Sequence, residues 1–150
     1  MNIETERFGG LDIDKDKIVY FPNGILGFPE LKRYILLENN KDLPYGWLQA
    51  IDDRCIAFVV MDPLTFRPDY KPSIRENEIA DLEVKDESDL CILTILTIPP
   101  KDSERITANL QGPLVINLAN RRGKQLVLQD SSYTCKYPLF HETGLSSLTY

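Results

Sequence analysis

The sequence predicts an all-β fold, in the form of a single small antiparallel β-barrel-like domain with one or two short helical turns. Roughly ten short runs rich in Val, Ile, Tyr, Phe and Leu recur along the chain, and clusters of Pro, Gly, Asn and Asp separate them. No long helical pattern lies between these runs, which favours an antiparallel sheet folded on itself. The 150 residues show no internal repeat or linker, so they are most simply one domain, 1–150.

Each predicted strand is an apolar, β-branched or aromatic run that ends at turn-forming residues. In chain order, the predicted strands are Phe8–Asp12, Ile18–Phe21, Tyr34–Leu37, Trp47–Ile51, Ile56–Met61, Leu90–Ile98, Ile106–Leu110, Leu114–Leu118, Gln125–Gln129 and Tyr133–Tyr137.

The turns and helical stretches follow from local composition. Asn120–Gly123 resembles a hairpin turn in which Gly123 takes a positive φ. Glu76–Leu82 is the one convincing helical stretch, because Ile79 and Leu82 share a face at i, i+3. A second short turn fits Pro29–Arg33.

All of the excess negative charge lies in one segment. The chain carries a net charge of −6, and residues 76–89 (ENEIADLEVKDESD) hold seven acids and one lysine, which is also −6. Nucleic-acid binding needs Lys and Arg, and the only basic cluster is Arg121-Arg122-x-Lys124, so direct nucleic-acid binding is not expected. A solvated face is the plain interpretation of the acidic run. The functional interpretation is a site for a basic protein surface, formed by Glu76, Glu78, Asp81, Glu83, Asp86, Glu87 and Asp89.

The sequence contains no recognisable catalytic or cofactor motif. Neither a GxSxG nucleophile turn nor a glycine-rich phosphate loop occurs, and the only histidine, His141, is expected on the surface. Cys55, Cys91 and Cys135 are too dispersed for a zinc site and are expected to be small buried hydrophobes. No catalytic residue, metal or cofactor is therefore expected.

The expected location is the cytoplasm, without membrane contact. Residues 1–10 lack the basic and apolar regions of a secretory signal. The most apolar stretch, Leu90–Ile98, is too short to cross a bilayer as a helix.

A series of turn motifs carries a resemblance to a known family. The series consists of FPNGILGFPE at 21–30, FVVMDP at 58–63 with Phe66 and PDY at 68–70, LTIPP at 96–100, TANLQGPLVIN at 107–117, GKQLVL at 123–128, and Tyr133 with Pro138-Leu139. Together, in this order, the motifs resemble the FliW family of flagellar assembly factors, over about residues 5–140. One small departure is Gly112 before Pro113, where alanine is expected. Residues 141–150 match nothing in the family and are expected to form a flexible tail.

The resemblance implies a non-enzymatic binding protein with a small β-barrel-like fold. Members of this family bind flagellin in the cytoplasm and also bind the RNA-binding translational regulator CsrA. Secretion of flagellin frees the factor, which then captures the regulator and relieves repression of flagellin translation. The alternative from the fold alone is a β-barrel that binds a small ligand, with an enzyme as the third choice.

The stretch at 107–117 has two interpretations, which are compatible. In the structural one, Gly112-Pro113 forms a bend, and Asn109 and Asn117 satisfy main-chain groups that the interrupted ladder leaves unpaired. In the functional one, the bend exposes a strand edge to flagellin. The predicted flagellin-binding residues are Phe66, Asn109, Pro113, Leu114, Val115, Ile116 and Asn117.

Overall fold

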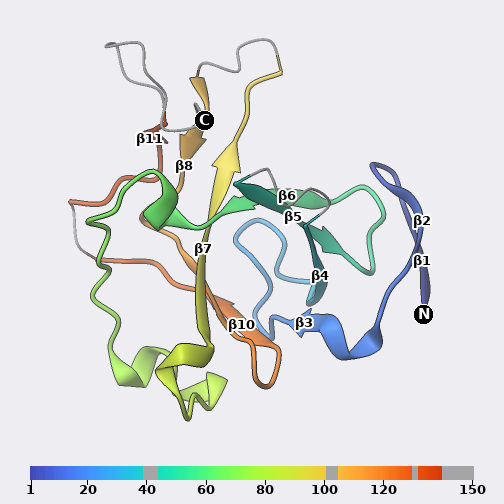
Figure 1. Cartoon of the computed structure of the whole chain (residues 1–150), viewed down its shortest axis with the longest axis horizontal. Coiled ribbons are helices and arrows are strands. Elements are labelled where there is room, and N and C mark those ends of the chain that lie inside the picture. The colour runs from blue at the N-terminus through green and yellow to red at the C-terminus, as the bar shows by residue number, and fades with distance from the viewer. Residues whose placement is uncertain (39–43, 101–104, 130–131, 140–150) are drawn as a thin grey trace.

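Seven strands close into a β-barrel, which confirms the predicted fold class (Figure 1). The computed structural model describes residues 1–38, 44–100, 105–129 and 132–139. In barrel order the strands are β7 (Leu90–Thr97), β6 (Ala57–Met61), β5 (Tyr45–Ala50), β4 (Arg33–Leu37), β3 (Ile18–Tyr20), β10 (Arg122–Gln125) and β9 (Leu114–Asn117). Neighbouring strands are antiparallel, except that β10 and β3 are parallel.

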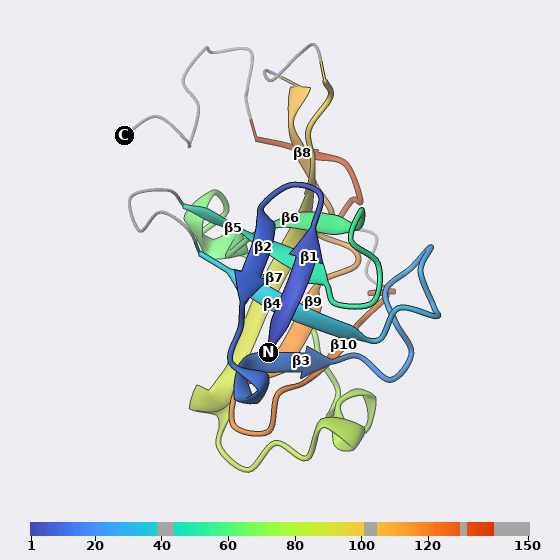
Figure 2. The same cartoon turned by 90° about the vertical axis from the view of Figure 1, so that its right-hand side faces the viewer.

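The long strand β7 closes the barrel. Its first half, Leu90–Leu93, pairs with β9, and its second half pairs with β6 through Thr94–Leu96. The end of β7 also pairs with β8 (Thr107–Ala108), which in turn pairs with β11 (Tyr137–Pro138). Figure 2 shows this extension rising above the barrel.

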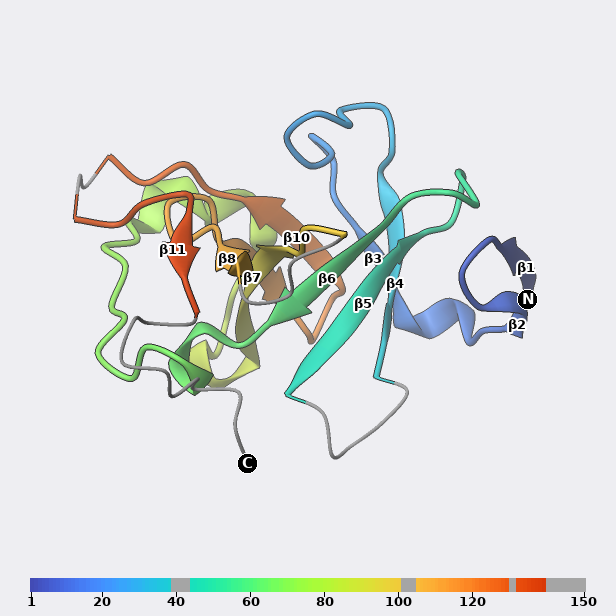
Figure 3. The same ribbon diagram turned by 90° about the horizontal axis from the view of Figure 1, so that it is seen from above.

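A separate hairpin covers part of the outer surface of the barrel. It consists of β1 (Asn2–Thr5) and β2 (Gly9–Asp12), and it packs Ile3 against Ile35 of β4. Figure 3 shows the hairpin beside β4. The prediction missed β1 because its four residues carry only one strongly apolar side chain.

Apolar side chains fill the barrel interior. One cluster of buried residues draws members from β3, β4, β5, β6, β7 and β9, including Tyr34, Leu48, Leu114 and Ile116. These side chains alternate with outward-facing residues along each strand, as the pleat of a sheet requires.

The turn before β10 differs from the prediction. Arg121, not Gly123, takes the left-handed conformation, with φ of 60°. Gly123 lies inside β10, where a Cβ atom would come within 2.7 Å of the Phe21 ring. The strand therefore begins at Arg122, three residues before the predicted start.

Five short 3-10 turns lie wholly within the described residues. The predicted stretch Glu76–Leu82 forms two of them, η3 (Glu76–Glu78) and η4 (Ala80–Leu82). The others are η1 (Lys15–Lys17), η2 (Pro63–Thr65) and η5 (Glu87–Asp89). Pro29–Arg33 forms no helix; β4 already begins at Arg33. No helix in the described ranges is long and apolar enough to cross a membrane.

Candidate protein-interaction site

The acidic segment, residues 76–89, is packed against the outside of the barrel. Its three 3-10 turns lie below β10 in Figure 1. Leu82 is only 1% exposed and forms a cluster with Val115 of β9 and Leu126. The segment is therefore anchored through an apolar side chain and is not a solvated loop.

Two asparagines hold the segment in place by hydrogen bonds to its main chain. The buried Asn117 Nδ2 donates to the carbonyl oxygens of Leu82 at 2.9 Å and Glu83 at 3.4 Å. Asn120 Nδ2 also donates to the Leu82 oxygen, at 2.8 Å. The Asn117 Oδ1 accepts from the Ala119 main-chain N–H at 3.0 Å. Asn117 therefore satisfies main-chain groups, as the structural interpretation predicts.

The single basic cluster pairs with the same segment. Lys124 Nζ lies 3.2 Å from Asp81 Oδ1, and it also donates to the Glu78 carbonyl. Arg122 Nη1 lies 3.8 Å from Glu83 Oε1. The two clusters lie far apart in the sequence, and their opposite charges are the only signal there that they pair. We refer to Asn117, Asn120, Arg122 and Lys124 as the clamp.

The clamp leaves five of the seven acids outside these ion pairs. Glu78 Oε1 accepts from the Arg75 main-chain N–H, and Asp86 Oδ1 accepts from the Ser88 N–H and hydroxyl. These bonds from Ser88 hold the pKa of Asp86 below its ordinary value. Of these five, Glu76, Asp86 and Glu87 are exposed, and Glu78 and Asp89 are half-buried. The predicted acidic residues thus lie on a segment that is fixed to the barrel, and more of its carboxylates lie outside these ion pairs than in them.

The predicted strand edge at β9 does not exist. β9 pairs with β10 on one side and β7 on the other, and Leu114, Val115 and Ile116 are fully buried. Leu114 and Ile116 face the barrel interior, whereas Val115 packs under Leu82, so the expected alternation is correct but both faces are covered. The prediction that this strand is open to a partner was wrong.

The bend before β9 is closed by its own polar groups. Asn109 Oδ1 accepts from the Gly112 N–H at 2.8 Å, and the buried Pro113 precedes the strand. Gln125 Nε2 donates to the Gly112 carbonyl at 3.0 Å. The structural interpretation of the bend is therefore confirmed.

Phe66 is a core residue and not the exposed anchor that the flagellin hypothesis needed. It is 8% exposed and stacks on Tyr137, with ring centroids 5.9 Å apart. The 3-10 turn η2 directs it into a second apolar cluster beside β6, β7 and β8.

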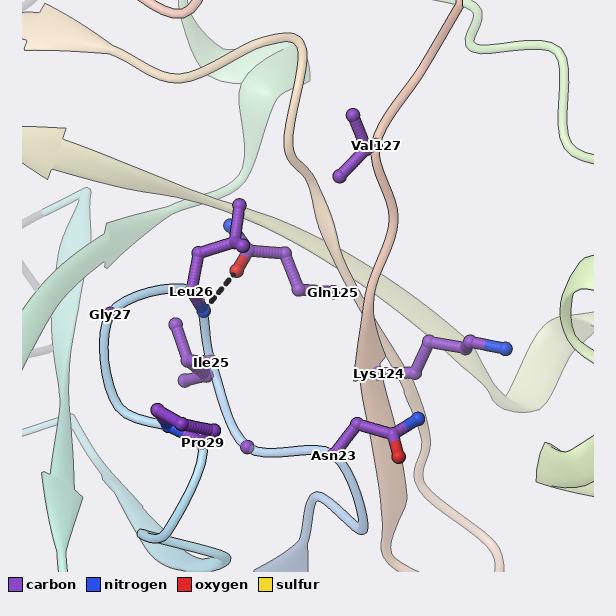
Figure 4. A pocket seen from close by; sticks show the side chains of 9 residues that line it. Asn23, Ile25, Leu26, Gly27, Pro29, Lys124, Gln125 and Val127 are labelled. Atoms are coloured by element: carbon purple, nitrogen blue, oxygen red, sulfur yellow. Dashed lines mark hydrogen bonds between the residues drawn. The ribbon is translucent and has the colours of Figure 1, made fainter.

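The glycine-containing loop at 21–30 borders a small surface hollow of about 270 Å³ (Figure 4). Gln125 Oε1 accepts from the Leu26 N–H at 2.8 Å and ties the loop to β10. Leu26 and Val127 expose apolar side chains at its rim. This hollow lies on the surface, whereas a ligand-binding barrel would need its space inside, where the buried cluster is packed.

The described residues offer no cluster of three or more His, Cys, Asp or Glu that could hold a metal ion. His141 and the predicted tail 141–150 lie outside the described residues. The expectation for the cysteines was wrong, since Cys55 and Cys135 are exposed and Cys91 is half-buried. On the surface, Asp52 forms an ion pair with Arg33, and the hydrogen bond from Arg33 lowers the pKa of the Asp52 carboxyl.

Comparison with known proteins identifies a family. A family model described as FliW protein matches residues 2–139. A flagellar assembly factor FliW from Natranaerobius thermophilus is 40% identical over 144 residues, which cover 96% of this chain and 95% of the relative. One from Alkaliphilus metalliredigens is 42% identical, with 95% and 88% covered. A crystal structure of the flagellar assembly factor FliW matches with a TM-score of 0.87 and 34% identity, covering 95% of this chain and 99% of that chain.

Proposed function

This chain belongs to the FliW family of flagellar assembly factors, and we propose that it acts in the cytoplasm by binding two proteins, flagellin and the RNA-binding translational regulator CsrA. Binding of the regulator relieves its repression of flagellin translation. The protein transforms no substrate in this scheme.

The clamped acidic segment is the observation that supports the regulator as a partner. An RNA-binding protein must carry Lys and Arg on the surface that meets phosphates. The five carboxylates outside the clamp's ion pairs offer the opposite charge, on a segment that Leu82 and the clamp fix to the barrel. Because the segment is already ordered, little conformational entropy is lost when a partner binds it.

Charge reversal tests this proposal. Glu76 and Glu87 are exposed and form no ion pair or side-chain hydrogen bond with the described residues, so Glu76→Lys with Glu87→Lys should leave the fold unchanged. We expect regulator affinity, measured by calorimetry at low salt, to fall about ten-fold, with a flatter salt dependence.

A matched control carries the same change of charge elsewhere. Asp16→Lys with Glu30→Lys alters two exposed acids outside the segment. It should reduce affinity much less than the segment variant does. Equal losses in the two variants would show that only net charge matters, and no loss in either would leave the segment as solvated surface.

Flagellin is the second proposed partner. Family membership supports it, because the relatives are named flagellar assembly factors. The buried strand β9 gives no support to the earlier assignment of this partner to an open edge. Immobilised protein exposed to native cell extract should retain both flagellin and the regulator, and retention of neither would overturn the proposed function.

A further inference from the structure

Among the described residues, one edge of β7 has no strand partner beside the acidic segment. Leu90–Leu93 pairs with β9 on one side, but on the other side the ladder to β6 ends at the pair Met61–Thr94. The chain leaves the sheet there because Asp62 caps η2 and Pro63, which has no N–H, follows. Thr94 Oγ1 donates to the Met61 carbonyl at 3.0 Å and closes the end of the ladder.

An apolar groove of about 410 Å³ occupies this position. Its lining includes Pro63 and Leu64 from η2, Cys91 and Ile92 from β7, and Leu118 just after β9. Leu64 is 52% exposed and Leu118 is 39% exposed, although both are large and apolar. We call this feature the β7 groove.

The groove also meets unpaired main-chain groups. The Asp89 carbonyl accepts from the Leu118 N–H, and the Ile95 carbonyl accepts from the Asn109 N–H. Odd-numbered residues along β7 therefore direct their main-chain groups toward β9 and β8. Antiparallel alternation then directs the main-chain groups of Ile92 toward the groove. The strand registers of the described residues give Ile92 no pairing partner on that side.

The charge around the groove is predominantly negative. Asp62 lines it, and the η5 acids Glu87 and Asp89 come immediately before β7. Burial raises the pKa of the Cys91 thiol, and the nearby carboxylates of Asp62 and Glu38 raise it further, while Arg121 opposes them. An occupant with Lys or Arg beside an apolar side chain would match this combination.

We propose that the β7 groove receives a segment of the basic regulator, which packs a bulky aliphatic side chain against Leu64 and Leu118 and directs a neighbouring Lys or Arg at the acidic rim. The inference rests on the proposed function, because it specifies how that partner is held. The Ile92 main-chain groups favour an extended segment over a small molecule, since an added strand can hydrogen-bond to them.

Substitution of the two exposed leucines tests the groove directly. Leu64→Glu and Leu118→Glu, made singly, each add a negative charge, which by itself would attract a basic partner. A loss of regulator affinity must therefore come from the lost apolar contact. We expect at least a ten-fold weaker Kd for each variant, with an unchanged midpoint of urea unfolding.

Leu26→Glu is the matched control. Leu26 is 64% exposed and apolar, but it lines the other hollow, beside the loop at 21–30. This variant should bind the regulator within about two-fold of the unsubstituted protein, as is usual for a surface residue outside an interface.

The outcomes separate the groove from the proposed function. If the leucine variants bind the regulator with the same Kd as the control variant, the groove assignment is overturned, and the proposed function is not. Loss of flagellin binding with regulator binding intact would show that the groove has another occupant, and it would also overturn the assignment. If the unsubstituted protein binds neither purified partner, the proposed function fails, and the assignment of this occupant fails with it.

Discussion

Replacing Asn117 by alanine should release the acidic segment from the barrel. The substitution removes two well-formed hydrogen bonds, to the Leu82 carbonyl at 2.9 Å and from the Ala119 N–H at 3.0 Å, besides a longer contact of 3.4 Å. A net contribution of about 1 kcal/mol per bond, with the further cost of the Ala119 N–H that loses its acceptor, gives a loss of roughly 2–3 kcal/mol in the free energy of unfolding. Asn120 still bonds to the Leu82 carbonyl, so this oxygen keeps a partner and the loss stays within that range.

Urea unfolding followed by the fluorescence of the single tryptophan, Trp47, measures this loss. The matched control is Asn120→Ala, which removes one hydrogen bond to the same carbonyl and one from the Arg122 N–H. Both bonds are made by an exposed residue, so the loss should be about 1 kcal/mol and smaller than that of Asn117→Ala. Limited trypsin digestion provides a local readout, because Lys85 lies within the segment between η4 and η5. Cleavage after Lys85 should become faster in Asn117→Ala.

Two results would refute this reasoning. The first is a loss below about 0.5 kcal/mol for Asn117→Ala, which is the range of ordinary surface substitutions. The second is an unchanged cleavage rate at Lys85 in a destabilised variant, because Asn117 would then stabilise the barrel without holding the segment.

Two further predictions concern the barrel interior. Gly123→Ala should destabilise the protein by roughly 1–3 kcal/mol in urea unfolding, because the new methyl group would lie 2.7 Å from the Phe21 ring, whereas Gly10→Ala meets only the movable end of Glu4 and should cost less. Tyr34→Phe should raise stability by about 1 kcal/mol at neutral pH, since the buried Tyr34 hydroxyl has no hydrogen-bond partner in the described chain. Burial raises the pKa of Tyr34 to about 12, so between pH 10 and 12 the unfolded chain loses this proton while the native state keeps it, and stability falls as pH rises. The phenylalanine variant should show a smaller fall over that window in unfolding midpoints measured by circular dichroism, and an identical fall would contradict the assignment.

The sequence predicted most of the barrel strands because their signal is local. Runs such as Leu90–Ile98 and Ile56–Met61 are long, apolar and bounded by turn residues, and they fold into β7 and β6 with shifts of one residue. The error at β10 arose from a long-range constraint. Gly123 looks like a turn glycine from its neighbours, but the Phe21 ring, about a hundred positions earlier, requires the absence of a side chain there.

The acidic site was predictable from its charge. The residues predicted to bind flagellin, in contrast, could not be distinguished from core residues in the sequence. Leu114–Asn117 reads equally well as an open edge or a central strand, and only the pairing of β9 with both β10 and β7 decides between them. The clamp was also hidden, because Lys124 and Asp81 lie far apart in the sequence. Leu64 and Leu118 gave no signal, since exposure of a single leucine depends on where a ladder ends.

The acidic segment and the β7 groove should contribute to different steps of one binding reaction. Carboxylates such as Glu76 and Glu87 face solvent, where charge accelerates encounter but is screened once salt is added. Apolar contacts at Leu64 and Leu118 form only after docking, so their loss should act mainly on the dissociation rate. Surface-plasmon resonance with the regulator should therefore show slower association for the charge-reversal variant and faster dissociation for the leucine variants. If both kinds of variant change only the association rate, the two features act as one electrostatic contact. If both change only the dissociation rate, they act as one apolar contact.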